Sequence, residues 1–106
     1  MSVLYWNDEN FKDELQKSEV PVIVDFFADW CRPCKVLAPV FEELAAEYEG
    51  KCNFVKINVD ESPNTTSSYS VMSIPTLIAF VKGEKKTVLT GAMGKEELVS
   101  FIEKHL

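Results

Sequence analysis

Two cysteines separated by two residues are the most reactive feature of the sequence. Cys31 and Cys34 lie in the segment Trp-Cys-Arg-Pro-Cys-Lys. A pair at this spacing can close a disulfide or supply half of a zinc site. Zinc would need further ligands, and only Cys52 and His105 remain, at spacings that match none of the usual zinc arrangements. The pair is therefore predicted to be a redox couple that binds no metal.

The two sulfurs are expected to be unequal, because Cys31 lies at or just before the start of a predicted helix and Cys34 lies one turn inside it. Free backbone amides and the helix dipole favour an anion at the first position, and Arg32 and Lys35 add positive charge. These effects predict a lowered thiol pKa for Cys31, which would be the exposed, attacking thiolate. Cys34 would be the shielded thiol that resolves the intermediate.

The remaining nucleophile candidates are less favoured. A cysteine hydrolase would need a histidine base, and the single histidine, His105, is the penultimate residue, where packing or surface exposure is the ordinary role. Cys52 follows Gly50 and Lys51 at the edge of a predicted strand and is interpreted as a small, semi-buried residue. No role is assigned to Cys52.

Asp25 is the other residue whose position suggests chemistry. It lies inside the run Val-Ile-Val-Asp-Phe-Phe, where a carboxylate must be buried at a cost unless it is paired or protonated. Carboxyl groups with perturbed pKa values gather at active sites, so we predict a functional role for Asp25. A purely structural ion pair is the alternative.

The elements that position these residues follow from the apolar periodicity. The run 21–27 is apolar on both alternating faces, which predicts a central strand covered on both sides. Helical spacing over 33–48 predicts a helix directly after the cysteines, with a kink at Pro39. The other predicted elements are a leading strand, a helix starting at Asn7, a strand over 53–59, a short helix from Ser62 to Tyr69, strands over 76–81 and 87–90 joined by a turn, and a terminal helix over 95–106. This order predicts a mixed sheet with helices on both faces.

Length and composition narrow the class of protein. The chain has 106 residues, of which 46% are hydrophobic and 26% charged, so a single globular domain over residues 1–106 is expected. A net charge of -6 would repel nucleic acids and anionic membrane surfaces. No apolar run approaches the ~20 residues of a membrane span, and the N-terminus lacks the pattern of a signal peptide. A cytoplasmic monomer that contacts neither nucleic acid nor membrane is expected.

Four separated matches, two segments and two single residues, resemble the thioredoxin family. The resemblance covers essentially the whole chain. Residues 24–35 resemble the active-site segment of the family, and Pro39 matches its kinked helix. Residues 74–77, Ile-Pro-Thr-Leu, resemble its cis-proline loop, and Gly91 resembles the neighbouring glycine. The resemblance implies a thioredoxin fold, with a central mixed sheet of about five strands flanked by four helices.

The resemblance also implies an activity, the reduction of disulfides in target proteins. Cys31 would attack a target disulfide and Cys34 would release the product, and an NADPH-dependent thioredoxin reductase would restore the dithiol without any bound cofactor. By the same analogy, Asp25 would shuttle the proton of Cys34, with Lys56 nearby. The residues expected to tune the redox couple are Arg32, Pro33, Lys35 and Lys56, and those expected to contact substrate are Trp30, Ile74, Pro75 and Ala92.

Arg32 departs from the family pattern, which has glycine between the first cysteine and the proline. A cation beside Cys31 favours the thiolate and hence the reduced form, so we expect a modestly more oxidising couple. An effect on the choice of partner is the alternative. Two other functions stay open: an oxidase or glutathione-linked reductase, and a docking module without catalysis, which would require neither the cysteines nor Asp25.

Overall fold

The computed structural model describes residues 2–106, which form one mixed sheet of five strands in the order β1-β3-β2-β4-β5. The strands are β1 (Val3–Tyr5), β2 (Val22–Phe27), β3 (Asn53–Asn58), β4 (Thr76–Val81) and β5 (Glu84–Thr90). β2 pairs in parallel with β3 and antiparallel with β4, so it lies at the centre of the sheet. The central strand predicted from its apolar residues is confirmed.

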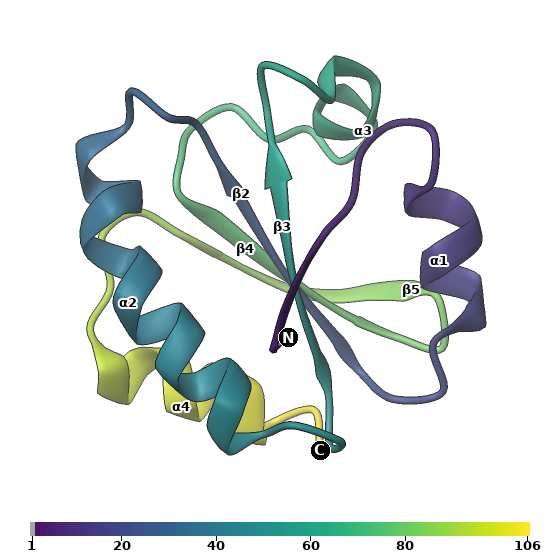
Figure 1. Ribbon diagram of the computed structural model, residues 1–106, viewed down its shortest axis with the longest axis vertical. Coiled ribbons are helices and arrows are strands. Elements are labelled where there is room, and N and C mark those ends of the chain that lie inside the picture. Colours follow the sequence, from purple (N-terminus) through teal and green to yellow (C-terminus); the bar gives the residue numbers. More distant parts are fainter. Residues whose placement is uncertain (1) are drawn as a thin grey trace.

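Helices cover both faces of the sheet, as expected. They are α1 (Phe11–Lys17), α2 (Arg32–Glu47), α3 (Pro63–Ser68) and α4 (Lys95–Glu103). Figure 1 shows α2 and α4 together on one face of the sheet and α1 and α3 on the other. The expected arrangement of five strands and four helices is therefore confirmed over the residues that the structure describes.

Successive side chains of β2 point alternately into two separate hydrophobic cores. Ile23 faces α2 and α4 and packs with Phe41 and Leu98. Val24, on the opposite face, packs with Phe11 of α1 and with Phe80. Because successive strand side chains point to opposite faces, Asp25 shares the face of Ile23 and lies beneath α2. The sheet thus places this carboxylate on the same side as the helix that carries Cys34.

The start of α2 is defined by Cys31, which is the N-cap residue and keeps an extended backbone. Its Sγ accepts a hydrogen bond from the backbone N–H of Cys34 at 3.2 Å. Pro33 occupies the first turn, where the missing N–H of proline costs nothing. Pro39 lies inside the helix, which continues to Glu47. The prediction that a helix follows the cysteines directly is confirmed.

Three element boundaries differ from the sequence prediction by more than one residue. α1 begins at Phe11 rather than Asn7, whose side chain instead accepts hydrogen bonds from two backbone N–H groups in the preceding turn. β5 begins at Glu84, three residues before Thr87, because it pairs with β4 along its exposed polar half as well. α4 ends at Glu103, so His105 lies beyond the helix and contacts Thr87 of β5 through its ring nitrogen.

Candidate active site

The two cysteines form a disulfide at the N-terminus of α2. The S–S distance between Cys31 and Cys34 is 2.23 Å and their Cα atoms are 5.3 Å apart. The loop from β2 delivers Cys31 to the helix start, and the first turn of the helix brings Cys34 beside it. The structure therefore represents the oxidised form of a dithiol/disulfide couple.

The difference in exposure expected between the two sulfurs is not found in this form. Cys31 exposes 4% of its surface and Cys34 exposes 2%. Both pack with Ala28, and the half-buried side chains of Val59 and Ile74 lie against this cluster. The prediction of an exposed Cys31 was wrong for the disulfide form, because residues distant in the sequence cover it.

Asp25 belongs to a row of side chains that crosses the sheet. Its neighbours in register are Lys56 on β3 and Leu77 on β4, and Tyr5 on β1 is the partner of Lys56. The Lys56 ammonium lies 4.4 Å from the centroid of the Phe27 ring, which is a favourable cation–π position. Lys56, predicted to lie near Asp25, therefore occupies the adjacent position on the neighbouring strand.

The carboxyl group of Asp25 is completely buried and has no hydrogen-bond partner among residues 2–106. Burial disfavours the charged form and raises the pKa of Asp25 to about 7, while the positive charge of Lys56 acts in the opposite direction. Asp25 therefore exchanges a proton near neutral pH. Such a group can act as an acid or a base under physiological conditions.

The loop before β4 completes one side of the site. The Ile74–Pro75 peptide bond is cis, as the resemblance implied. Pro75 is buried and its carbonyl accepts a hydrogen bond from the N–H of Gly91 at 3.0 Å. Ile74 is half-buried and packs against the disulfide cluster. The predicted neighbourhood of Pro75, Gly91 and Cys31 is thus brought together.

Large apolar side chains are exposed next to the disulfide segment. Trp30, immediately before Cys31, exposes 69% of its surface, and Val36 on α2 also exposes 69%. The indole N–H of Trp30 donates a hydrogen bond to the carboxylate of Asp60 at 2.8 Å. Sequence reasoning identified Trp30 but missed Asp60, since a contact across 30 residues leaves no local pattern.

A pocket of about 290 Å³ lies beside the disulfide, between α2 and the loop before α4. It is lined by Arg32, Pro33, Val36, Leu37, Ala92 and Met93. Arg32, which is expected to tune the redox couple, and Ala92, which is expected to contact substrate, therefore line the same pocket. Lys35 is exposed on α2 and does not line it.

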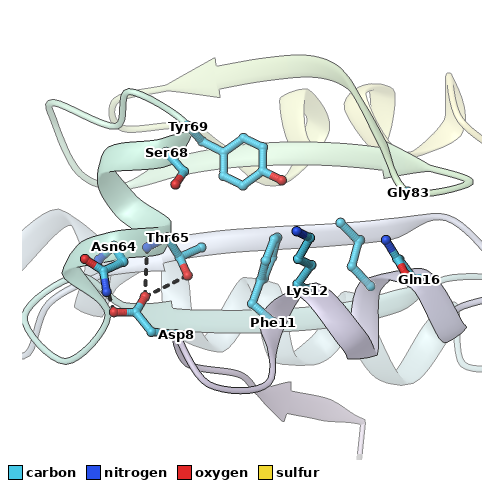
Figure 2. Close-up of a pocket in the computed structure, with 10 residues that line it drawn as sticks. Asp8, Phe11, Lys12, Gln16, Asn64, Thr65, Ser68, Tyr69 and Gly83 are labelled. Atoms are coloured by element: carbon cyan, nitrogen blue, oxygen red, sulfur yellow. Dashed lines mark hydrogen bonds between the residues drawn. The ribbon is translucent and has the colours of Figure 1, made fainter.

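A second pocket, of about 360 Å³, lies on the opposite face of the sheet, between α1 and α3 (Figure 2). There the Asp8 carboxylate accepts hydrogen bonds from the backbone N–H groups of Asn64 and Thr65 and from the Thr65 hydroxyl. Burial acts to raise the pKa of Asp8, but these hydrogen bonds hold it below its usual range. The pocket is separated from the disulfide by the sheet, and its polar contacts tie the segment before α1 to α3.

Residues 2–106 contain neither a metal-binding cluster nor a membrane-spanning helix. No group of three His, Cys, Asp or Glu side chains within this range is arranged to hold a metal ion. No helix in the same part of the chain is long and apolar enough to cross a bilayer. Cys52 is buried and is not disulfide-bonded, and burial raises the pKa of its thiol to about 11.

The geometry defines a class of protein. A disulfide at a helix N-terminus, a buried carboxyl on the sheet face below that helix and an apolar rim are the parts of a dithiol/disulfide oxidoreductase.

Comparison with known proteins gives the family. The sequence model of the family described as Thioredoxin matches residues 2–104. Thioredoxin of Staphylococcus saprophyticus is 49% identical over 106 residues, covering 100% of both chains. Thioredoxin of Synechocystis sp. is 48% identical over 100 residues, covering 94% of each chain. The chloroplastic M-type thioredoxin of Spinacia oleracea is 49% identical over 94% of this chain and 55% of its own length. The chain belongs to the thioredoxin family and is a disulfide oxidoreductase, so the expected thioredoxin fold and the expected dithiol/disulfide chemistry are confirmed.

Proposed function

We propose that the chain reduces disulfide bonds in target proteins through the thiols of Cys31 and Cys34. The observation that carries this proposal is the Cys31–Cys34 disulfide at the start of α2, framed by exposed apolar side chains. The backbone N–H of Cys34, which donates a hydrogen bond to the sulfur of Cys31, would stabilise a thiolate on that sulfur after reduction. Cys31 is therefore the proposed nucleophile.

The reaction proceeds by two exchanges. The Cys31 thiolate attacks one sulfur of the target disulfide, so that the target S–S bond breaks, a mixed disulfide forms and the other target sulfur leaves as a thiolate. The Cys34 thiolate then attacks the sulfur of Cys31 and displaces the second target thiolate. Two electrons pass to the target, and the chain is left with its own disulfide.

Asp25 is proposed to accept the proton that Cys34 must lose before the second exchange. Its position on the sheet face beneath α2 and a pKa of about 7 support this role. Lys56, on the adjacent strand, is proposed to limit the rise of that pKa. Arg32, Pro33 and Lys35 border the cysteines in the sequence and are proposed to tune the couple.

Target recognition is assigned to the rim of the site. Trp30, Ala92, Ile74 and Pro75 are proposed to hold the target segment, with the backbone of Ile74 pairing with it as an added strand. The exposure of Trp30 and the packing of Ile74 on the disulfide cluster support this assignment. Pro75 would act through the shape of its loop, because its own side chain is buried.

The partners proposed for this chain are those expected for a member of the family. We propose that a thioredoxin reductase, using NADPH, returns the disulfide to the dithiol, and that residues 1–106 act as a single-domain monomer. A reducing compartment such as the cytoplasm is proposed, because the dithiol must be maintained there. Cell fractionation with an antibody against the chain tests this location, and recovery in an organelle would contradict it.

Insulin reduction coupled to NADPH and thioredoxin reductase tests the activity. Turnover is expected for the wild type and for Cys52→Ser, which removes the free cysteine outside the site, and loss of turnover is expected for Cys31→Ser and Cys34→Ser. Turnover with glutathione but not with the reductase would assign the chain to glutathione-linked reductases. Absence of turnover with both reductants would overturn the proposed function.

A further inference from the structure

We infer that Arg32 selects target segments in which an acidic side chain lies within two residues of the reacting cysteine, with an aliphatic neighbour in the pocket beside Arg32. The inference rests on the proposed reductase function and names the kind of segment that this site prefers. It assigns to Arg32 a role in recognition in addition to its proposed effect on the redox couple.

The pocket beside the disulfide supplies the apolar half of the recognition. Its lining residues are Arg32, Pro33, Val36, Leu37, Ala92 and Met93, so every lining side chain except Arg32 is apolar. A volume of about 290 Å³ is ample for one aliphatic side chain. Val36, which is 69% exposed, would lose part of its contact with water when the pocket is filled.

The guanidinium of Arg32 supplies the charged half. Arg32 is exposed and takes part in no ion pair among residues 2–106, although the whole chain carries a net charge of -6. Asp60, a carboxylate near the disulfide segment, already accepts the hydrogen bond of Trp30. A planar guanidinium binds a carboxylate through two parallel hydrogen bonds, and a lysine brought to the same place would be repelled.

Covalent chemistry fixes the distance between Arg32 and the target. Arg32 directly follows Cys31, and neighbouring Cα atoms are about 3.8 Å apart. Once the target cysteine is bonded to the sulfur of Cys31, its flanking residues are held within reach of the long Arg32 side chain. The charge of Arg32 then changes the relative rates for different targets, because opposite charges accelerate encounter and like charges oppose it.

Competition between matched peptides tests this inference. The substrates are disulfide-linked homodimers of short peptides that carry Leu and Glu, Leu and Lys, or Ser and Glu beside the cysteine. Pre-reduced protein is mixed with each peptide, and the second-order rate constant is measured by acid quench and chromatography. The readout is the ratio of rate constants for two peptides, compared between wild type and Arg32→Gln. Intrinsic peptide reactivity and any change in the redox couple cancel from this comparison.

The ratio for the Glu peptide over the Lys peptide is expected to fall about 2–5-fold in Arg32→Gln, as for an exposed ion pair, and to reverse in Arg32→Glu. About 1 M salt should reduce the wild-type ratio, because the Debye length then falls to about 3 Å. Lys35→Gln, which removes an exposed charge outside the pocket, is the matched control and should change the ratio less.

An unchanged ratio in Arg32→Gln, or an equal change in Lys35→Gln, would overturn the role of Arg32. Equal rates for the Leu and Ser peptides would overturn the role of the pocket. If wild type reduced none of the peptides, the proposed reductase function would fail, and this inference would fail with it.

Discussion

Replacement of Asp25 by asparagine tests the burial of its carboxyl group. Asparagine keeps the shape of the side chain and its lack of partners but cannot ionise. Any difference in stability between wild type and Asp25→Asn that varies with pH therefore reports the charge on the carboxylate alone. The disulfide form is the appropriate sample, because both cysteines are then unable to titrate.

The size and sign of the effect follow from the pKa of Asp25, which burial raises from 3.8 to about 7. Below about pH 4 the carboxyl is neutral in the folded and unfolded chains, and its ionisation costs nothing. Between about pH 4 and 7 the unfolded chain ionises first, so the free energy of unfolding falls by about 1.4 kcal/mol for each pH unit. Above pH 7 the loss levels off at about 4 kcal/mol. This is a large share of the free energy of unfolding of a typical domain, which is roughly 5–15 kcal/mol.

Urea unfolding followed by far-UV circular dichroism measures this difference. Asp25→Asn should match wild type at about pH 3 and exceed its free energy of unfolding by about 4 kcal/mol at about pH 8.5. Asp29→Asn removes an exposed carboxylate four residues after Asp25 and is the matched control for the loss of one negative charge. A stability difference between Asp25→Asn and wild type that does not change with pH would refute the reasoning.

Three further predictions concern the cysteines and their neighbour. Cys34→Ser should accumulate a mixed disulfide between Cys31 and its target, visible on a non-reducing gel, and absence of the adduct would contradict the assigned order of attack. Arg32→Gly should lower the reduction potential measured against a glutathione buffer by less than about 30 mV, since the charge is exposed; a higher potential would contradict this. Cys52, whose pKa burial raises to about 11, should resist iodoacetamide at about pH 8 in the folded disulfide form and react in urea, as followed by mass spectrometry; rapid labelling of the folded chain would contradict it.

Strongly periodic segments of this fold were predictable from the sequence. The run around Asp25 is apolar on both faces, and only a central strand buries both. The helix after the cysteines was predictable from apolar residues that recur at helical spacing. The first half of β5 was not, because Glu84, Lys85 and Lys86 are exposed, and the strand is formed there by backbone pairing of Glu84 and Lys85 with β4.

The features of the site that depend on residues close together in the sequence were predictable. The position of Cys31 at the helix start and the burial of Asp25 both follow from residues close in sequence. The covering of Cys31 by Ile74 and the bond between Trp30 and Asp60 depend on segments brought together only by the sheet. Such contacts carry no periodic signal, so the sequence led to the wrong exposure for Cys31 in the disulfide form.

The polar start of β5 has a consequence for the behaviour of the protein in concentrated solution. A sheet edge offers unpaired backbone groups to any extended chain, and proteins that meet partly unfolded partners risk pairing there. In this sheet one edge strand, β1, has only three residues, and the other, β5, begins with the exposed charges of Glu84, Lys85 and Lys86. Short length and lysine are two of the devices that blunt edges against aggregation. Both margins of the sheet are thus protected against pairing with an extended segment of another chain.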